Sequence, residues 1–368
     1  MLKKLYIHQY RCLQNFEINL SSLRSALLLG KNGAGKSSIL DAVGVLQQIG
    51  QGVTQISTLI REEDFSFGEK EKPILLEIEA ELNAQNYHYI LEIEFPENFH
   101  APKVNKEILE VDGKTILHRE GGKTFLHQTK EFTLDWHHIG LPLISNTKPN
   151  SPIAIFRAWL GGIIVLAPWP AQFHAVSKQE SPYLDKQATK VMDWVRHLLA
   201  ESPHLYAKMS DFMRQRMHDF DVFKFENTGK NERELIFSFQ NTGHCKLDLN
   251  LGQLSDGEKI YFLTSAILAA ISAPQPILCL WDEPDHFIAL REISHFITAC
   301  RKEFENNPNG SQLVMSTHNP SVINEFSGHN TLIVSRASHA QPARLSRLQD
   351  QEYCSSSVID AFENGELD

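Results

Sequence analysis

The stretch that decides the fold is "GKNGAGKS", Gly30 to Ser37, which follows the apolar run "ALLLG" (26–30). Apolar residues at helical spacing from about Lys36 to Gln47 predict a helix directly after it. The stretch thus fits the phosphate-loop pattern GxxxxGK[ST] at every fixed position, between a predicted strand and a predicted helix. Its glycines let backbone N–H groups turn inward onto phosphate oxygens, and the helix N-terminus adds partial positive charge. We expect the nucleotide to bind at Gly30, Lys31, Asn32, Gly33, Ala34, Gly35, Lys36, Ser37 and Ser38.

A second stretch, "ILCLWDEPD" (277–285), complements the phosphate loop. Its apolar residues predict a buried strand that ends at Asp282 and Glu283, and ligands of parallel sheets bind at the carboxyl ends of strands. Asp282 can hold Mg²⁺ through a water, and the Ser37 hydroxyl can bind the same ion. Glu283 is placed to polarise the attacking water as the general base. Alone, these would be two solvated acids; beside a phosphate loop they predict a magnesium and hydrolysis site.

A third stretch, "STHNP" (316–320), ends the next predicted strand with His318. A histidine at the end of a strand is often only structural. At this edge of the sheet, an imidazole can hydrogen-bond a γ-phosphate or orient the attacking water. We therefore place His318 in the site, with Lys36 reaching the β and γ phosphates.

The stretch "LSDGEK" (254–259) begins another predicted helix. Ser255 followed three residues later by Glu258 is typical of a capping box, and Gly257 is unfavourable in a first helical turn. The same helix start, with its free N–H groups, suits a phosphate at Ser255 and Gly257. Both interpretations stay open on these residues alone.

The composition is that of a globular protein without a membrane-spanning segment. The 368 residues include 42% hydrophobic and 22% charged residues, and no run of 18 apolar residues occurs. The N-terminus turns polar too soon for a secretory signal, so we expect a cytoplasmic protein. The five widely spaced cysteines have no CxxC motif, so we expect neither disulfide bonds nor a zinc site. The net charge of −10 indicates that any contact with DNA would be local.

The alternation of predicted strands and helices indicates an α/β fold with a parallel sheet covered on both faces. Residues 73–135 differ, because alternating apolar and polar residues and the turns "DG" and "GG" predict antiparallel hairpins. We expect a nucleotide-binding core at 1–50 and 250–340, an inserted β-rich lobe at 51–180, a helical segment with short strands at 181–250, and a C-terminal tail at 341–368.

The order of these motifs resembles that of ABC-class ATPases: phosphate loop, signature, acidic strand end and strand-end histidine. "LSDGEK" is similar to their signature motif, with Asp256 where transporters usually have a second glycine. Together with "LWDEPD" and "STHNP", it looks most like the branch of RecF, SMC and OLD proteins. The phosphate loop and signature are about 220 residues apart, farther than in transport cassettes. Without heptads we expect no SMC-like arms, and the 30 or so residues after the final strand are too few for the Toprim nuclease domain of OLD proteins.

This resemblance implies an ABC-ATPase head: a mostly parallel sheet with the phosphate loop, an inserted antiparallel lobe and a helical signature lobe. It implies ATP and Mg²⁺ as ligands, and a homodimer or higher homo-oligomer that closes head to head on ATP through composite sites. The output would be conformational control of a partner effector, a separately encoded nuclease in a phage-defence module. The alternatives are a RecF-like clamp that binds DNA in repair or replication, and a nucleotide-regulated scaffold, against which Glu283 argues. Arg11 and Gln172 are further candidates for contacts with the nucleotide and its Mg²⁺.

Overall fold

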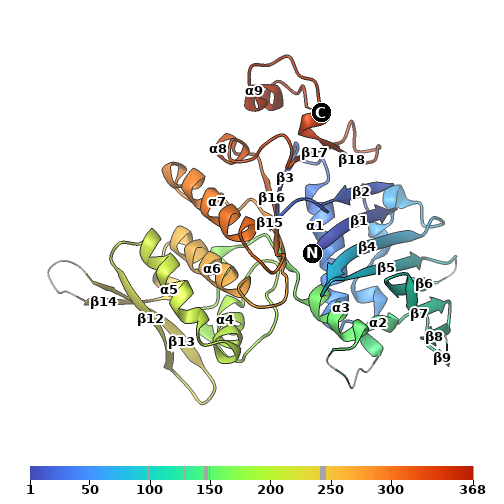
Figure 1. The fold of residues 1–368 in the computed structure, drawn as a ribbon, viewed down its shortest axis with the longest axis horizontal. Helices are drawn as coiled ribbons and strands as arrows, with labels where there is room; N and C mark the ends of the chain where they lie inside the picture. Colours follow the sequence, from blue (N-terminus) through green and yellow to red (C-terminus); the bar gives the residue numbers. More distant parts are fainter. Residues whose placement is uncertain (98, 128, 145–147, 149, 241–245, 368) are drawn as a thin grey trace.

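The computed structural model describes residues 1–367 apart from 98, 128, 145–147, 149 and 241–245. At its centre lies a mostly parallel sheet, with antiparallel hairpins on one side and helices on the other (Figure 1). The central sheet has the strand order β10 (Ile164–Leu166), β15 (Leu278–Asp282), β16 (Gln312–Thr317), β3 (Ser25–Leu29), β17 (Thr331–Ser335) and β18 (Arg344–Arg347). Only β18 runs antiparallel to its neighbour.

Both faces of the parallel sheet are buried, as the continuous apolar strands predict. In β3, Ala26 and Leu28 pack into one hydrophobic cluster, and Leu27 and Leu29 pack into the other. The first cluster contains the apolar face of α1 (Lys36–Gly50), and the second contains α6 (Asp256–Ala270) and α7 (Leu290–Glu305). Because side chains of a strand alternate between faces, helices on both sides are needed to cover it.

The hairpins form a separate antiparallel sheet. Its order is β2 (Phe16–Asn19), β1 (Leu2–His8), β4 (Ile74–Leu82), β5 (Gln85–Glu94), β6 (Lys103–Val111), β7 (Lys114–Glu120), β8 (Lys123–Leu126) and β9 (Lys130–Thr133). The predicted turns at 112–113 and 121–122 connect β6 to β7 and β7 to β8.

A third sheet and helices that include α6 form the lobe on the opposite side (Figure 1). In this sheet β13 (Arg233–Gln240) pairs with β11 (Val176–Ser177), β12 (Phe220–Asn227) and β14 (Lys246–Asn250). The helices of this lobe that precede α6 are α4 (Val191–Glu201) and α5 (Leu205–Arg216). The other helices are α2 (Gly140–Leu143), α3 (Pro152–Gly161), α8 (Pro320–Ile323) and α9 (Val358–Glu363).

Strand pairing adds detail to the predicted domain boundaries, which stay a prediction. The N-terminal strands β1 and β2 join the antiparallel sheet, where β1 pairs with β4. Conversely, β10 lies within the range predicted for the inserted lobe but pairs with β15 of the parallel sheet. The chain therefore crosses between the two sheets several times.

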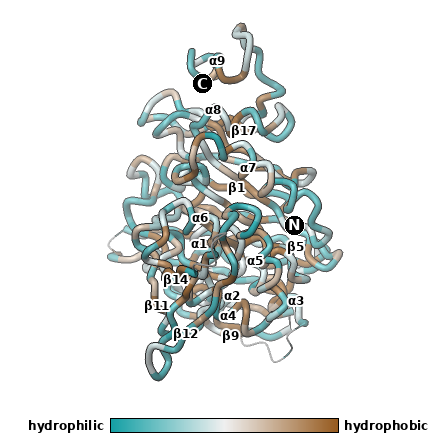
Figure 2. The backbone as a smooth tube through the Cα atoms, turned by 90° about the vertical axis from the view of Figure 1, so that its left-hand side faces the viewer, coloured by the Kyte–Doolittle hydropathy of each residue, from teal (hydrophilic) through white to brown (hydrophobic). Residues whose placement is uncertain are grey.

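The hydrophobic residues concentrate inside this body, and the hairpin tip between β12 and β13 is hydrophilic (Figure 2). Among the described residues, no helix combines the length and the hydropathy needed to cross a membrane.

Helices α1 and α3 cross where two glycines meet. A Cβ atom added to Gly50 would lie 2.1 Å from the backbone nitrogen of Gly161, and one added to Gly161 would lie 2.9 Å from the carbonyl carbon of Gly50. Real Cβ atoms do not approach backbone so closely, so only glycine allows this crossing. Gly44, in the same helix, has no atom within 4 Å of the position that a Cβ would take.

We expect Gly50→Ala to lower the free energy of unfolding by about 3 kcal/mol, because the two backbones must separate. Gly44→Ala is the matched control and should raise it by about 0.5–1 kcal/mol, since alanine favours a helix interior. Urea unfolding measures both values. Equal stability of the two variants would show that the crossing is loose.

Candidate functional site

The predicted motifs meet at one edge of the parallel sheet because three neighbouring strands end there. In the register of the sheet, Asp282 at the end of β15 lies beside Ser316, and Thr317 at the end of β16 lies beside Leu29. The phosphate loop therefore begins next to the two stretches that carry the acids and the histidine. Lys31 to Ser38, Asp282, Glu283 and His318 all line one cavity of about 290 Å³.

The phosphate loop presents its backbone to this cavity. Gly35 is the N-cap of α1, with a φ of 114° that favours glycine, and it makes no side-chain capping bond. The N–H groups of the first turn of α1 thus have no capping side chain, and they add to the positive end of the helix dipole. A Cβ at Gly35 would lie 2.9 Å from the Cys12 Sγ. This arrangement fits an anion such as a nucleotide phosphate.

The ammonium of Lys36 is held inside the loop. Lys36 is only 7% exposed, and its Nζ donates to the carbonyl oxygens of Gly30 at 2.5 Å and Lys31 at 3.2 Å. Burial lowers the pKa of Lys36, while the charges of Asp282 and Glu283 oppose that shift. The side chain is therefore positioned by backbone acceptors before any ligand arrives.

His318 faces the same ammonium, with its Nε2 3.1 Å from Lys36 Nζ. Burial, followed by the charge of Lys36, lowers the pKa of His318 below 6.5. Because an ammonium can only donate, Nε2 accepts from Lys36 in this geometry, so the ring is neutral and its proton lies on Nδ1. Glu283 Oε1 lies 3.6 Å from Nε2, and this contact is not an ion pair at neutral pH.

Asp282 and Ser37 provide the oxygen atoms that Mg²⁺ prefers. Both line the cavity, and the Ser316 hydroxyl donates to the Asp282 carboxylate, which orients it. A serine hydroxyl, a carboxylate and room for water fit a partly hydrated magnesium ion beside a phosphate.

Glu283 occupies an unusual backbone conformation. Its φ is 48°, in the left-handed region, and its N–H donates to the Ser316 carbonyl at 2.9 Å. Such a conformation costs about 1–3 kcal/mol for a residue other than glycine and is concentrated at functional sites. His286 Nδ1 lies 2.8 Å from the Glu283 carboxylate. The turn aims this acid at the cavity rather than along the strand.

Ser255 and Gly257 lie elsewhere. Ser255 caps α6 through a complete capping box: its Oγ accepts from the Glu258 N–H at 3.4 Å, and its own N–H donates to the Glu258 carboxylate at 2.7 Å. A Cβ at Gly257 would lie 3.0 Å from the Phe287 carbonyl. Both residues line a second cavity, of about 660 Å³, which shares no lining residue with the phosphate-loop cavity among the described residues.

Arg11 and Gln172 are not among the described residues that line the phosphate-loop cavity. Arg11 is held by two carboxylates: its Nε donates to Asp64 at 2.8 Å, and its guanidinium also pairs with Asp41. Gln172 is exposed at the end of the short helical turn η4 (Pro170–Gln172). Their roles stay predictions.

The cavity also includes residues that the motifs did not indicate: Cys12, Arg336 and His339. Arg336 and His339 follow β17 and also line an adjoining cavity of about 740 Å³. The position of Arg336 directly after a predicted parallel strand was a signal that could have indicated it.

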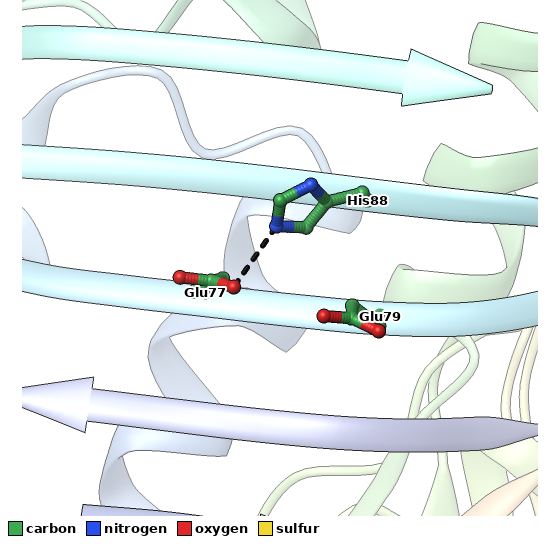
Figure 3. A group of neighbouring side chains, drawn as sticks. All are labelled: Glu77, Glu79 and His88. Atoms are coloured by element: carbon green, nitrogen blue, oxygen red, sulfur yellow. Dashed lines mark hydrogen bonds and ion pairs between the residues drawn. The ribbon is translucent and has the colours of Figure 1, made fainter. Parts of the chain in front are cut away.

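Another group of side chains, on the outer face of the antiparallel sheet, has atoms close enough to chelate a metal: Glu77, Glu79 and His88 (Figure 3). His88 Nε2 lies 3.0 Å from Glu77. However, Lys4 Nζ lies 3.8 Å from Glu77 and 3.7 Å from Glu79, so an ammonium already compensates both carboxylates. We regard the group as a cross-strand network of charges.

Comparisons with known proteins agree with this geometry. A family model described as "AAA domain, putative AbiEii toxin, Type IV TA system" matches residues 25–324, which is more than half of the chain. No curated protein matches the chain. Among solved structures, it resembles an SMC head bound to the C-terminal winged-helix domain of ScpA, with a TM-score of 0.60, 14% identity, and coverage of 95% of this chain and 98% of that one. It also resembles an SMC head with an extended coiled coil, bound to a ScpA domain derived from Pyrococcus furiosus. That match has a TM-score of 0.50 and 14% identity, and covers 99% of each chain.

At such low identity the two structures support the fold alone, and they agree with the predicted ABC-ATPase head. The family match adds membership. This chain belongs to the AAA-domain family described as putative AbiEii toxins of type IV toxin–antitoxin systems, and it has the fold of the SMC heads.

Proposed function

We propose that this chain binds MgATP and hydrolyses it in a site that two copies of the chain complete together. One observation carries the proposal: the phosphate loop with its acids and His318 lines one cavity, and Ser255 with the positive end of α6 lines another. Each cavity offers half of what a γ-phosphate needs, and the described residues of a single chain do not bring the halves together. A head-to-head dimer, or a higher oligomer with the same contact, supplies the second half in trans.

Each residue then has a chemical role. Lys36 and the backbone of the phosphate loop bind the phosphates. Ser37 and Asp282 would hold Mg²⁺, which would neutralise phosphate charge when bound. Glu283 takes a proton from the attacking water. His318 orients the water by accepting from it, or the γ-phosphate by donating its ring N–H.

His286 connects the two cavities within one chain. It contacts Glu283 at 2.8 Å and also lines the Ser255 cavity. A partner that docks in the Ser255 cavity would therefore contact a residue that positions the general base. This link is a route by which assembly and hydrolysis influence each other.

The output that we propose is conformational control of an effector protein, a separately encoded nuclease in a phage-defence module. The family description points to toxin–antitoxin systems, and both similar SMC heads were solved with a bound domain of ScpA, so heads of this fold bind partner proteins. A RecF-like clamp in repair or replication is the alternative. The net charge of −10 argues against it, and salt-sensitive, submicromolar binding of DNA by the purified chain would favour it.

We expect Lys36→Ala to abolish ATP binding and hydrolysis while the fold stays intact, because the only change is the loss of one ammonium at the phosphates. Binding of a fluorescent ATP analogue and circular dichroism check this. Lys190→Ala, which removes an exposed lysine before α4, is the control and should bind normally. Unchanged affinity in folded Lys36→Ala would contradict the assignment of the loop.

We expect Glu283→Gln to bind MgATP normally and to hydrolyse it at least about a hundredfold more slowly, because base catalysis is lost. It should accumulate with ATP as a closed oligomer in size-exclusion chromatography. Glu201→Gln, an exposed acid at the end of α4, serves as the control for loss of one negative charge and should hydrolyse ATP normally. Turnover of Glu283→Gln at the wild-type rate would leave Glu283 as an ordinary strand-end acid.

We expect Ser255→Arg to bind ATP but not to hydrolyse it, because its phosphate loop is intact and its signature is blocked. Loss of the N-cap alone would cost about 1 kcal/mol of stability without affecting a partner. Mixed with inactive Lys36→Ala, it should recover at most about a quarter of wild-type activity if the two sites fire independently, since half of randomly formed dimers are mixed and each contains one complete site. Differential tags confirm subunit exchange. No recovery in an exchanged mixture would mean either strictly coupled sites or a signature that acts in cis, and both contradict independent shared sites.

A further inference from the structure

The cavity that contains Ser255 also contains a cation that the motifs did not indicate. Arg216, the last residue of α5, lines this cavity together with Ser255, Gly257 and His286. It precedes the signature by almost forty residues in the sequence and belongs to no predicted motif. The following inference rests on the function proposed above, in which this cavity receives the nucleotide of a second copy.

The guanidinium of Arg216 lacks an oxygen partner in the part of the chain that the structure describes. Its Nε is buried and has no hydrogen-bond acceptor, and no carboxylate of a described residue lies within ion-pairing distance. The guanidinium lies over the ring of Phe212, whose centroid is 5.3 Å from the guanidinium carbon. The ring supports the group without satisfying its donors.

Arg214, two residues earlier in the same helix, is different. Its side chain is half-exposed, pairs with Asp211 at 3.1 Å and donates to the Asp221 carbonyl at 2.9 Å. Arg214 shows that an arginine near the end of α5 can find acceptors for its guanidinium within the chain. Arg216 has no such partner among the described residues, so its guanidinium can bind an acceptor that enters the cavity from outside the chain.

The acids that line this cavity do not accept from the Arg216 guanidinium. The Glu258 carboxylate accepts from Ser255 in the capping box, and Glu292 accepts from the Tyr261 hydroxyl at 2.9 Å. Asp219 also lines the cavity but lies beyond ion-pairing distance of Arg216. The positive end of α6 and the Arg216 guanidinium both line the cavity. An anion with several oxygens fits both.

We propose that Arg216 is a catalytic residue that contacts the γ-phosphate of ATP bound to the phosphate loop of a second copy. In hydrolysis, the water oxygen bonds to the γ-phosphorus, the bond from phosphorus to the bridging oxygen breaks, and Glu283 of the copy that holds the nucleotide accepts the proton. Arg216 stabilises the negative charge on the phosphoryl oxygens as that bond breaks. Hydrolysis would then require the α5 end of one copy as well as its signature serine.

The first test replaces the guanidinium. Arg216→Gln should bind the fluorescent ATP analogue as the wild type does, since its own phosphate loop is intact, and its kcat should fall at least about a hundredfold, because an arginine at a transferring phosphoryl group contributes factors of this size or more. Arg214→Gln is the matched control and should hydrolyse ATP at the wild-type rate. Wild-type kcat in Arg216→Gln would overturn the proposal.

A second variant covers the case in which Arg216→Gln fails to fold by circular dichroism. Arg216→Lys keeps the charge and the packing of the stem but lacks the planar fork, so its kcat should fall at least about tenfold with ATP binding retained. Wild-type kcat in folded Arg216→Lys would overturn the role of the guanidinium.

The decisive test asks in which copy Arg216 acts. A mixture of Arg216→Gln and Lys36→Ala should recover about a quarter of wild-type activity, because each mixed dimer joins an intact phosphate loop to an intact Arg216 of the other chain. The mixture of Ser255→Arg and Lys36→Ala reports on the shared site alone. If the Ser255 mixture recovers and the Arg216 mixture does not, Arg216 acts within its own chain, and this inference is wrong while the proposed function stands. If neither recovers although the chains exchange, the shared site itself fails.

Discussion

The in-register pairing of β15, β16 and β3 is the constraint on which the rest of this molecule depends. Parallel strands that pair without a shift end at the same level, so residues more than two hundred positions apart in the sequence emerge side by side. A slip of one residue would turn the buried side chains of β3 to the opposite face of the sheet, where the packing of α1 or α6 would be lost. The two hydrophobic clusters therefore fix the site without containing any of its polar residues.

Within the site, the charges are arranged around one buried ammonium. The ammonium of Lys36 donates to two backbone carbonyls and to the neutral ring of His318. Burial lowers the pKa of both side chains. The carboxylates of Asp282 and Glu283 oppose the shift of Lys36. The strained turn at Glu283 points the second acid toward the same space. Such preorganisation means that the phosphate-loop cavity needs little rearrangement when a phosphate binds.

The start of α6 at Ser255 shows how one feature can serve two purposes. The capping box at Ser255 is complete, so the helix start is stabilised within its own chain. The same geometry leaves a positive helix end open to a cavity, and Arg216, which has no acceptor among the described residues, lines that cavity. Stability of α6 and recognition of a partner's phosphate are compatible because the cap uses only part of the helix end. The structural and functional interpretations of "LSDGEK" are therefore not alternatives.

The sequence by itself determined the features that depend on neighbouring residues: the phosphate loop, the capping box at Ser255, the hairpin turns of the antiparallel sheet and the α/β class. These follow from fixed spacings, backbone conformation and the periods of helices and strands, all of which act within a few residues. Only the tertiary structure decided that β1 and β2 join the hairpins and that Cys12 and Arg336 line the phosphate-loop cavity. It also decided that Arg216 lines the cavity of Ser255 without an acceptor among the described residues. These positions result from packing between segments far apart in the sequence, and no local spacing encodes which distant surfaces will meet.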